Sequence, residues 1–161
     1  MDTVDNLLSQ WHAERPDLDV SPLGIAIRIE KLAKLLQRDT ARRLAVVGLK
    51  PWEYDVLAAL RRQGRPYSLP ASELAKAALL TAGAMTTRID HLENQRLVRR
   101  SPDPDDRRGV RVSLTAAGLK RIDAAVEARL AGAESAVGIL RKRERSAAEN
   151  ALRTMLMSIR P

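Results

Sequence analysis

The sequence DPDDRRGVRVSLT at residues 103–115 decides the fold. It follows the run LVRR at residues 97–100, and it includes residues 110–114, where apolar and polar side chains alternate as they do in a strand. Two short strands joined by a tip of proline, aspartate and arginine predict a β-hairpin with positive charge on its turn. Because the rest of the chain has helical patterns, we interpret this hairpin as a wing that reaches into a groove of DNA.

Three predicted helices precede the hairpin in the order of a helix-turn-helix. We expect them over residues 52–63, 71–79 and 82–95, with Thr81 as the N-cap of the third. The third helix places apolar residues on one face and small or polar residues on the opposite face. Its position directly before the wing makes it the predicted recognition helix, the one that enters the major groove.

Helices are also predicted on both sides of this winged unit. Apolar residues recur at helical spacing over residues 4–13, 23–47, 115–141 and 146–159. The stripes on the second and the last of these helices would stay exposed on a single small winged unit. Exposed apolar faces of that size usually mark an interface, so the pattern predicts a homodimer.

The expected fold class is therefore mainly α (α+β): a winged helix-turn-helix with N- and C-terminal dimerisation helices. We expect the N-terminal helices over residues 1–48, where they contribute to the dimer and to the lid of a ligand pocket. The DNA-binding domain is expected over residues 49–116, and the C-terminal dimerisation helices over residues 117–161. All three parts are expected to form one compact chain.

The composition indicates an anionic partner and no catalytic or metal chemistry. The 161 residues carry a formal net charge of +8, although the first 20 residues are acidic. Cysteine is absent and the two histidines, His12 and His91, lie far apart, so we expect no metal site and no cofactor. Without a nucleophile-elbow or phosphate-loop motif, the chain is not expected to be an enzyme. No apolar run is long enough to span a membrane, and the expected location is cytoplasmic.

The outward face of the predicted recognition helix carries side chains suited to reading DNA. Small residues let the backbone approach the major groove, while hydroxyls and arginine meet phosphates and base edges. The N-terminus of the helix adds backbone N–H groups and a positive dipole end for phosphate. The predicted major-groove residues are Thr81, Gly83, Ala84, Thr86, Thr87 and Arg88.

The tip of the wing supplies the predicted minor-groove contact. Arg107 and Arg108 are placed where a narrow, A·T-rich groove concentrates negative potential. Asp106 is expected to hold Arg108 in one rotamer, so that less side-chain entropy is lost on binding. The alternative is a solvated turn whose exposed ion pairs contribute little.

Together these residues resemble the MarR family of bacterial transcription regulators. The resemblance covers roughly residues 50–118 and rests on TAGAMTTRIDHLE at residues 81–93, on the LVRR run and on the wing. It implies a homodimer, intertwined through its terminal helices, that binds double-stranded DNA at a pseudo-palindromic operator. It also implies that the major-groove residues above meet DNA and that Arg108, supported by Asp106, enters the minor groove.

A finer resemblance involves the N-terminal segment WHAERPDLD at residues 11–19. This segment is similar to the subgroup of regulators that responds to urate and related purines, and to regulators of small carboxylates. The resemblance implies a small anionic ligand, such as urate or xanthine, and carries four ligand-binding residues over to this chain. They are Trp11, Asp55, Arg62 and Arg100.

The chemistry of these side chains fits such a ligand. Trp11 offers a flat face for a planar ring, and Arg62 offers a forked donor for a carboxylate or an ionised purine oxygen. Asp55 lies two helical turns before Arg62, so both can face one cleft. We expect Asp55 to pair with Arg100 until an anion displaces it, which would release Arg100 and weaken DNA binding by about 1–3 kcal/mol.

Other functions remain open at this level. One is an architectural DNA-binding protein that binds with a steep salt dependence and no ligand response. Another is a ligand-binding or protein-interaction module that has kept the fold without DNA binding. The sequence does not choose between purine and carboxylate ligands, or between repression, which we expect, and activation.

Overall fold

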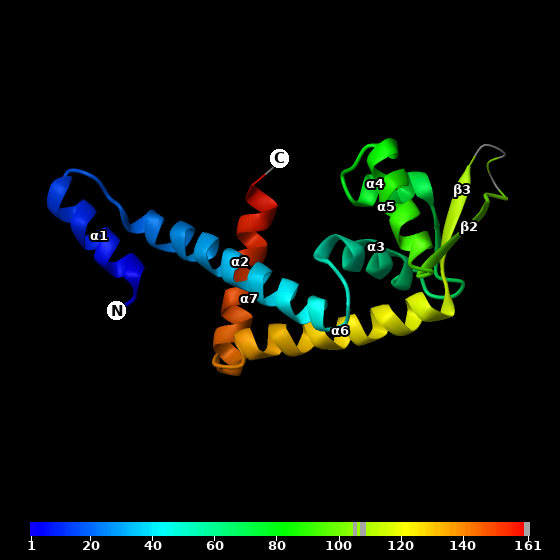
Figure 1. The fold of residues 1–161 in the computed structure, drawn as a ribbon. Coiled ribbons are helices and arrows are strands. Elements are labelled where there is room, and N and C mark those ends of the chain that lie inside the picture. The colour runs from blue at the N-terminus through cyan, green and yellow to red at the C-terminus, as the bar shows by residue number, and fades with distance from the viewer. Residues whose placement is uncertain (105, 107–108, 160–161) are drawn as a thin grey trace. The chain divides into compact units, whose positions relative to one another are not determined.

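The computed structural model describes residues 1–104, 106 and 109–159, and Figure 1 shows its elements. The chain divides into two compact units, Met1–Asp39 and Thr40–Pro161. The helices and strands, in chain order, are α1 (Thr3–Glu14), α2 (Ser21–Val46), α3 (Pro51–Arg61), β1 (Ser68–Pro70), α4 (Ala71–Ala77), α5 (Ala82–Asn94), β2 (Val98–Pro102), β3 (Val110–Leu114), α6 (Ala116–Val137) and α7 (Lys142–Ser158).

The second unit contains a winged helix-turn-helix. Its three strands form an antiparallel sheet in the order β1-β3-β2, with β3 in the centre. In the wing, Arg100 of β2 faces Val112 of β3. On the other edge, the hydroxyl of Ser113 donates to that of Ser68 over 2.9 Å and ties β1 to β3. Helices α3, α4 and α5 precede the wing in the chain, as the sequence predicts (Figure 1).

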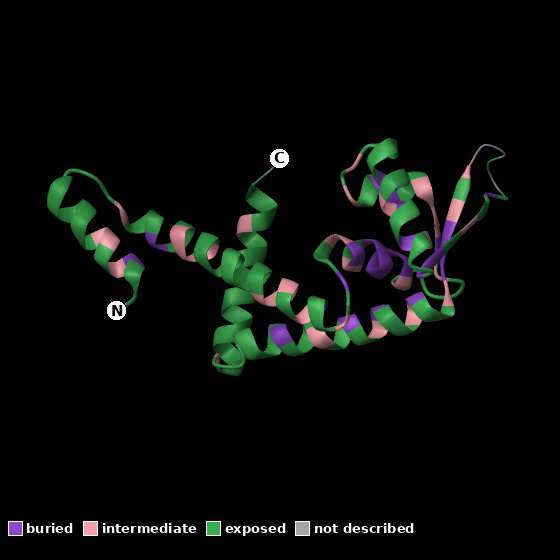
Figure 2. Ribbon diagram, viewed as in Figure 1, coloured by how far each residue is buried: buried purple, intermediate pink, exposed green. Residues whose placement is uncertain are grey.

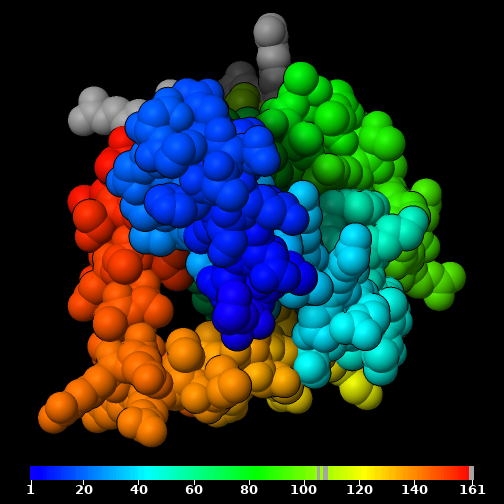
Figure 3. All heavy atoms as spheres, turned by 90° about the vertical axis from the view of Figure 1, so that its left-hand side faces the viewer, coloured from blue at the N-terminus to red at the C-terminus, as the bar shows by residue number. Residues whose placement is uncertain are grey.

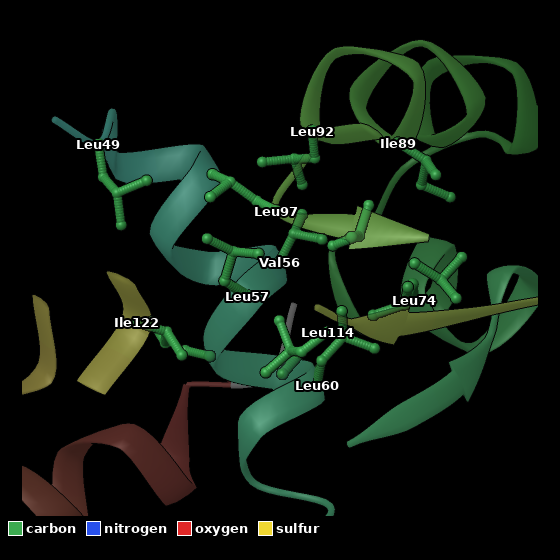
Figure 4. Packing of buried hydrophobic residues seen from close by; sticks show 14 of the residues in the cluster. Leu49, Val56, Leu57, Leu60, Leu74, Ile89, Leu92, Leu97, Leu114 and Ile122 are labelled. Atoms are coloured by element: carbon green, nitrogen blue, oxygen red, sulfur yellow. The ribbon is translucent and has the colours of Figure 1, made fainter. Parts of the chain in front are cut away.

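One apolar cluster holds this winged part together. Figure 4 shows side chains of α3, α5 and β3, together with Ile122 of α6, pointing into the same interior. Leu57, Leu60 and Leu92 are fully buried there, and Figure 2 shows the burial concentrated in α3 and in the strands beside it. Burial of each such side chain contributes about 1.5–3 kcal/mol, so this cluster fixes the geometry of the helix-turn-helix.

The start of α6 lies directly against the loop that leads from α5 into β2. Thr115 is its N-cap: its hydroxyl accepts from the N–H of Gly118 over 3.0 Å and donates to the carbonyl of Arg96 over 2.7 Å. A Cβ at Gly118 would lie 1.9 Å from the carbonyl oxygen of Leu97, so only glycine permits this approach. The wing and α6 are therefore fixed to each other at this junction.

The first unit is stabilised by polar contacts between α1 and the early part of α2. Asp2 is the N-cap of α1, and its carboxylate accepts from Arg28 over 2.9 Å. Hydrogen bonds from Arg28 lower the pKa of Asp2 to about 2. Asp5 accepts from the same guanidinium over 2.5 Å, and its pKa is lowered by the backbone N–H of Asp2 and by Arg28. Figure 3 shows the atoms of α1 and of the segment that follows it in contact (blue).

The C-terminal helix α7 contributes nothing to the buried core. The structure describes all of its residues, and none of them is buried, which Figure 2 shows as an almost continuous exposed colour. Leu152 and Leu156 nevertheless lie four residues apart and share one apolar face. Within the described part of the chain, no helix is long and apolar enough to cross a membrane.

The predicted fold class is confirmed, and the differences concern the ends of elements. Strand β1, three residues that pair with β3, was not predicted. The predicted long helix reaches residue 141, whereas α6 ends at Val137, with Gly138 as its C-cap. The predicted last helix begins near residue 146, whereas α7 begins at Lys142, where Glu144 accepts from the N–H of Arg141 over 2.7 Å. The division at residues 48 and 116 stays a prediction.

Candidate nucleic-acid interface

The N-terminal half of α5 presents an exposed face of small and polar residues. Thr81 is the N-cap of the helix, and its hydroxyl accepts from the N–H of Ala84 over 3.3 Å. The hydroxyls of Thr86 and Thr87 donate to carbonyls one turn earlier, over 2.9 Å and 3.2 Å. Their lone pairs stay available, and backbone approach is open because a Cβ at Gly83 would meet nothing within 4 Å. This face can approach the edge of a nucleic acid closely.

The opposite face of α5 fixes this orientation. Met85, Ile89 and Leu92 are buried, and they follow one another at the spacing of a single helical stripe. A rotation of α5 about its axis would expose all three side chains. Of the predicted major-groove residues, the core therefore holds Thr81, Gly83, Ala84, Thr86 and Thr87 outward and exposed, whereas Arg88 is half-buried.

Arg100 joins β2 to α5 and does not make the contact that the sequence analysis predicted for it. Its guanidinium donates to Asp90 and to Glu93 over 2.5 Å each, and to the carbonyl of Thr86 over 3.3 Å. Burial disfavours its charged form, but the hydrogen bonds to the two carboxylates outweigh burial and raise the pKa of Arg100. Among the described residues no ion pair links Arg100 to Asp55, so the predicted pair is wrong: β2 turns Arg100 toward the side of α5.

The base of the wing is held by a buried carboxylate. Asp103 is buried and accepts from Arg111 of β3 over 3.2 Å, while its N–H donates to the carbonyl of Gly109 over 3.0 Å. The N–H of Gly109 in turn donates to the carbonyl of Asp106 over 2.8 Å. Asp106 is exposed. Arg107 and Arg108 lie outside the described residues, and so does the predicted contact between Asp106 and Arg108.

A cavity of about 320 Å³ lies beside α3, α4 and the middle of α5. Asp55 and Arg62, two of the four predicted ligand-binding residues, both line it, together with Arg88 of α5. The remaining wall is apolar and consists of Val56, Ala59, Leu74, Ala77, Ala78 and Leu79. Such a volume and such a mixture of apolar wall and few charged groups are typical of small-molecule sites.

The fourth predicted ligand-binding residue, Trp11, belongs to the first unit. It lies on α1 with 47% of its surface exposed. Its predicted role as a face for a planar ligand stays a prediction. Within the described residues, no cluster of three or more histidine, aspartate or glutamate side chains is arranged to hold a metal ion.

Sequence reasoning missed a group of side chains that links α3 to α5. The guanidinium of Arg88 lies over the ring of Trp52, 5.2 Å from its centroid, and the ring of His91 lies 5.3 Å from the same ring. Glu53 is only 2% exposed and accepts from His91 over 2.8 Å. The sequence did hold one indication of this group: Arg88 and His91 are three residues apart on a predicted helix and therefore share one face.

Comparisons with known proteins agree with this geometry. The model of the MarR family matches residues 47–109. The HTH-type transcriptional regulator PecS of Dickeya dadantii is 36% identical to this chain over 124 residues, which are 77% of this chain and 75% of PecS.

Two solved structures are similar over most of the chain. AbsC, a MarR family transcriptional regulator from Streptomyces coelicolor, superimposes with a TM-score of 0.76 at 23% identity, over 87% of this chain and 95% of AbsC. BpsR of Bordetella bronchiseptica, whose DNA binding is regulated by 6-hydroxynicotinic acid, superimposes with a TM-score of 0.56 at 30% identity. That match covers 78% of this chain and 98% of BpsR.

Proposed function

The chain belongs to the MarR family of transcriptional regulators, and we propose that it represses its target genes as a homodimer that a small anionic ligand releases from DNA. Membership of the family makes it a DNA-binding regulator and not an enzyme. What we propose beyond that is the mode of binding, the direction of regulation and the chemistry of the ligand.

The exposed face of α5 is the observation that carries the DNA-binding part of the proposal. The buried stripe of α5 directs the predicted major-groove residues away from the core, and the N-cap leaves the first N–H groups of the helix at its exposed end. Phosphate is favoured at such an end by unpaired N–H groups and by the helix dipole. The wing lies beside α5 because Arg100 connects the two, so both elements engage one stretch of duplex.

The homodimer is supported by apolar residues that the chain leaves exposed. They occur on α2, on the second half of α6 and on α7, and include Ile25, Leu32, Leu35, Leu36, Leu130, Leu152 and Leu156. A second copy of the chain would cover these residues and bring two α5 helices to one operator. Twofold symmetry in the protein then requires a pseudo-palindromic site with half-sites about one helical turn apart, roughly 34–36 Å.

The cavity beside α5 supports a small anionic ligand. Its charged lining consists of two arginines and one aspartate, and arginine binds carboxylates through two parallel hydrogen bonds. Arg88 of α5 lines this cavity, so a ligand that binds its guanidinium there withholds it from DNA. This link between ligand and α5 does not require a pair between Arg100 and Asp55. A planar carboxylate such as 6-hydroxynicotinate, and an ionised purine such as urate or xanthine, both fit this donor set.

The DNA-binding part is tested by fluorescence anisotropy with the DNA upstream of the chain's own gene and with a scrambled duplex of equal length. We expect the specific duplex to bind at least about 1000-fold more tightly than the scrambled one. Arg108→Ala should weaken specific binding by about tenfold, whereas Lys120→Ala, which removes the same charge from an exposed position on α6, should not. Equal affinity for both duplexes would instead identify an architectural DNA-binding protein.

The ligand part is tested separately by thermal unfolding in the presence of urate, xanthine or 6-hydroxynicotinate. We expect at least one of them to raise the melting temperature, because a ligand that binds only the folded state stabilises it. Arg62→Gln should abolish the increase and Lys120→Gln should leave it unchanged. If none of the three anions changes either the melting temperature or the affinity for DNA, the proposed ligand class is wrong.

A further inference from the structure

A tryptophan outside the predicted DNA and ligand residues lies against the arginine of the recognition helix. Trp52 is the second residue of α3, and the guanidinium of Arg88 is 5.2 Å from the centroid of its ring. The imidazole of His91 is 5.3 Å from the same ring at an interplanar angle of 57°. Arg88 and His91 are three residues apart on α5 and therefore share one face, so a single indole spans both.

The imidazole that lies against the indole is held in place by Glu53, the residue that follows Trp52. Glu53 is buried, and one of its oxygens accepts from His91 over 2.8 Å and from the side-chain amide of Gln95 over 2.9 Å. Its other oxygen accepts from the backbone N–H of Lys50 over 2.7 Å. Charge-assisted hydrogen bonds of this kind are the stronger ones, and here they join the first turn of α3 to the last turns of α5.

Trp52 is not placed as an ordinary core residue. It is half-buried, whereas Val56 and Leu57, one turn later on α3, are buried in the apolar cluster. Its ring packs against the edge of the apolar cluster and also covers two polar side chains, Arg88 and His91, on the flank of α5. An aromatic ring in that position also attracts a guanidinium placed over its face.

We propose that Trp52 is a positioning residue for DNA binding: its indole ring, held by Glu53 through His91, preorganises the guanidinium of Arg88 on the recognition helix. The proposal rests on the function proposed above, in which Arg88 contacts DNA. A free arginine side chain has many rotamers, and ordering it on binding costs entropy. Stacking on Trp52 restricts those rotamers before DNA arrives, so removal of the ring weakens binding by about three- to tenfold.

The test is a double-mutant cycle for affinity to the upstream duplex, with Trp52→Leu, Arg88→Ala and the double variant. We expect each single variant to bind more weakly than the wild type and the double variant to bind no more weakly than Arg88→Ala alone. Trp52→Phe should restore most of the affinity, since a phenyl ring also attracts a guanidinium. A merely structural role of Trp52 would give additive losses, and additivity would overturn the proposal.

The outcome separates this proposal from the proposed function. If the wild type prefers the upstream duplex and Arg88→Ala binds it as tightly as the wild type does, the regulator function stands and the role of Trp52 is wrong. If the wild type does not prefer that duplex, the function itself fails. Where Trp52→Leu does not fold, Trp52→Met replaces it, and its loss must likewise vanish in the Arg88→Ala background.

Fluorescence gives a second readout that a structural role would not change. In a Trp11→Phe variant, Trp52 is the remaining tryptophan of the chain. We expect its emission to change when the upstream duplex is added, because a phosphate bound by the stacked guanidinium of Arg88 changes the electrostatic environment of the ring. The same titration with Arg88→Met added should give no change. An equal change in both variants would contradict the proposal.

Discussion

Leucine side chains are buried in the winged part of the chain but exposed on its last helix. In α3, Leu57 and Leu60 are completely buried among neighbours from other elements. In α7, Leu152 is 46% exposed and Leu156 is 76% exposed, although both lie on one apolar face. The two regions have equally regular helices and differ in whether the chain itself supplies the surface that covers the apolar face.

We propose that a second copy of the chain covers the apolar face of α7, whereas one chain alone covers the apolar faces of the winged part. Within the winged part, residues of the same chain cover the apolar core. Thr115 fixes the start of α6, and Arg100 of β2 is bound to carboxylates of α5. A helix such as α7 gains most of its stability in proteins from the packing of its apolar face. We infer that substitutions in the terminal helices mainly affect dimer formation, whereas substitutions in the core of the winged part mainly affect the stability of the fold.

The largest effect is expected where assembly fails. A variant with Leu152→Ser and Leu156→Ser should lose the dimer and lower operator affinity by about 100-fold or more, because one half-site no longer assists the other. Sedimentation should then give the mass of one chain, 17.8 kDa. The control Asn150→Ser, an exposed polar residue of the same helix, should leave the dimer intact. If the double variant still forms a dimer, α7 is not part of the interface.

The next effect concerns the closed core. Leu57→Ala should lower the free energy of unfolding by about 2–5 kcal/mol, because it leaves a cavity among buried neighbours. Val46→Ala, at an exposed position of α2, should change it by less than about 0.5 kcal/mol. Denaturant titrations of both variants at equal protein concentration measure the difference. A similar loss of unfolding free energy in the two variants would show that Leu57 is not packed in a closed core.

Two glycines sharpen the comparison within the winged part. Gly118→Ala places a Cβ 1.9 Å from the carbonyl oxygen of Leu97, so the start of α6 must move and the loss should be about 1–3 kcal/mol. Gly83→Ala meets nothing within 4 Å, and it should keep or slightly raise the melting temperature because alanine favours a helix. If Gly83→Ala destabilises the fold as strongly as Gly118→Ala does, the exposed face of α5 is misplaced.

The smallest effect is expected in the first unit, where the contacts are exposed and polar. The pKa of Asp2 lies at about 2 because Arg28 donates to the carboxylate, and the pKa of Asp5 is lowered as well. A lowered carboxyl pKa contributes stability above the unfolded value near 3.8, and that contribution is lost as the pH falls toward 2. NMR titration of Arg28→Gln should show the midpoint of Asp2 rising toward 3.8. An unchanged midpoint would mean that Arg28 is not the cause.

The sequence was sufficient where local signals and the fold agreed. The N-cap Thr81 and the apolar spacing of α5 predicted a helix that the structure contains. Strand β1 was not predicted because three residues carry no periodicity, and it pairs with residues of β3 that lie 41 to 45 positions later in the chain. Such long-range pairing is set by the tertiary fold and not by local sequence.

The candidate site was predictable to the extent that its residues share one helix. Asp55 and Arg62 line the same cavity because seven residues bring them to one face of the chain's third helix. The predicted pair of Arg100 with Asp55 was wrong because the orientation of β2 against α5 places Arg100 between Asp90 and Glu93. Its role toward a ligand stays a prediction. Trp52 was missed because its partners Arg88 and His91 belong to another helix.

A footprint on the upstream DNA tests most directly the claim that two copies of α5 read one operator. Hydroxyl-radical cleavage in the presence of the wild-type protein should show two protected regions related by twofold symmetry, roughly one helical turn apart. Thr87→Glu on the exposed face of α5 should abolish both regions together, since phosphate and carboxylate repel. A single protected region, or uniform protection equal to that on a scrambled duplex, would contradict the account.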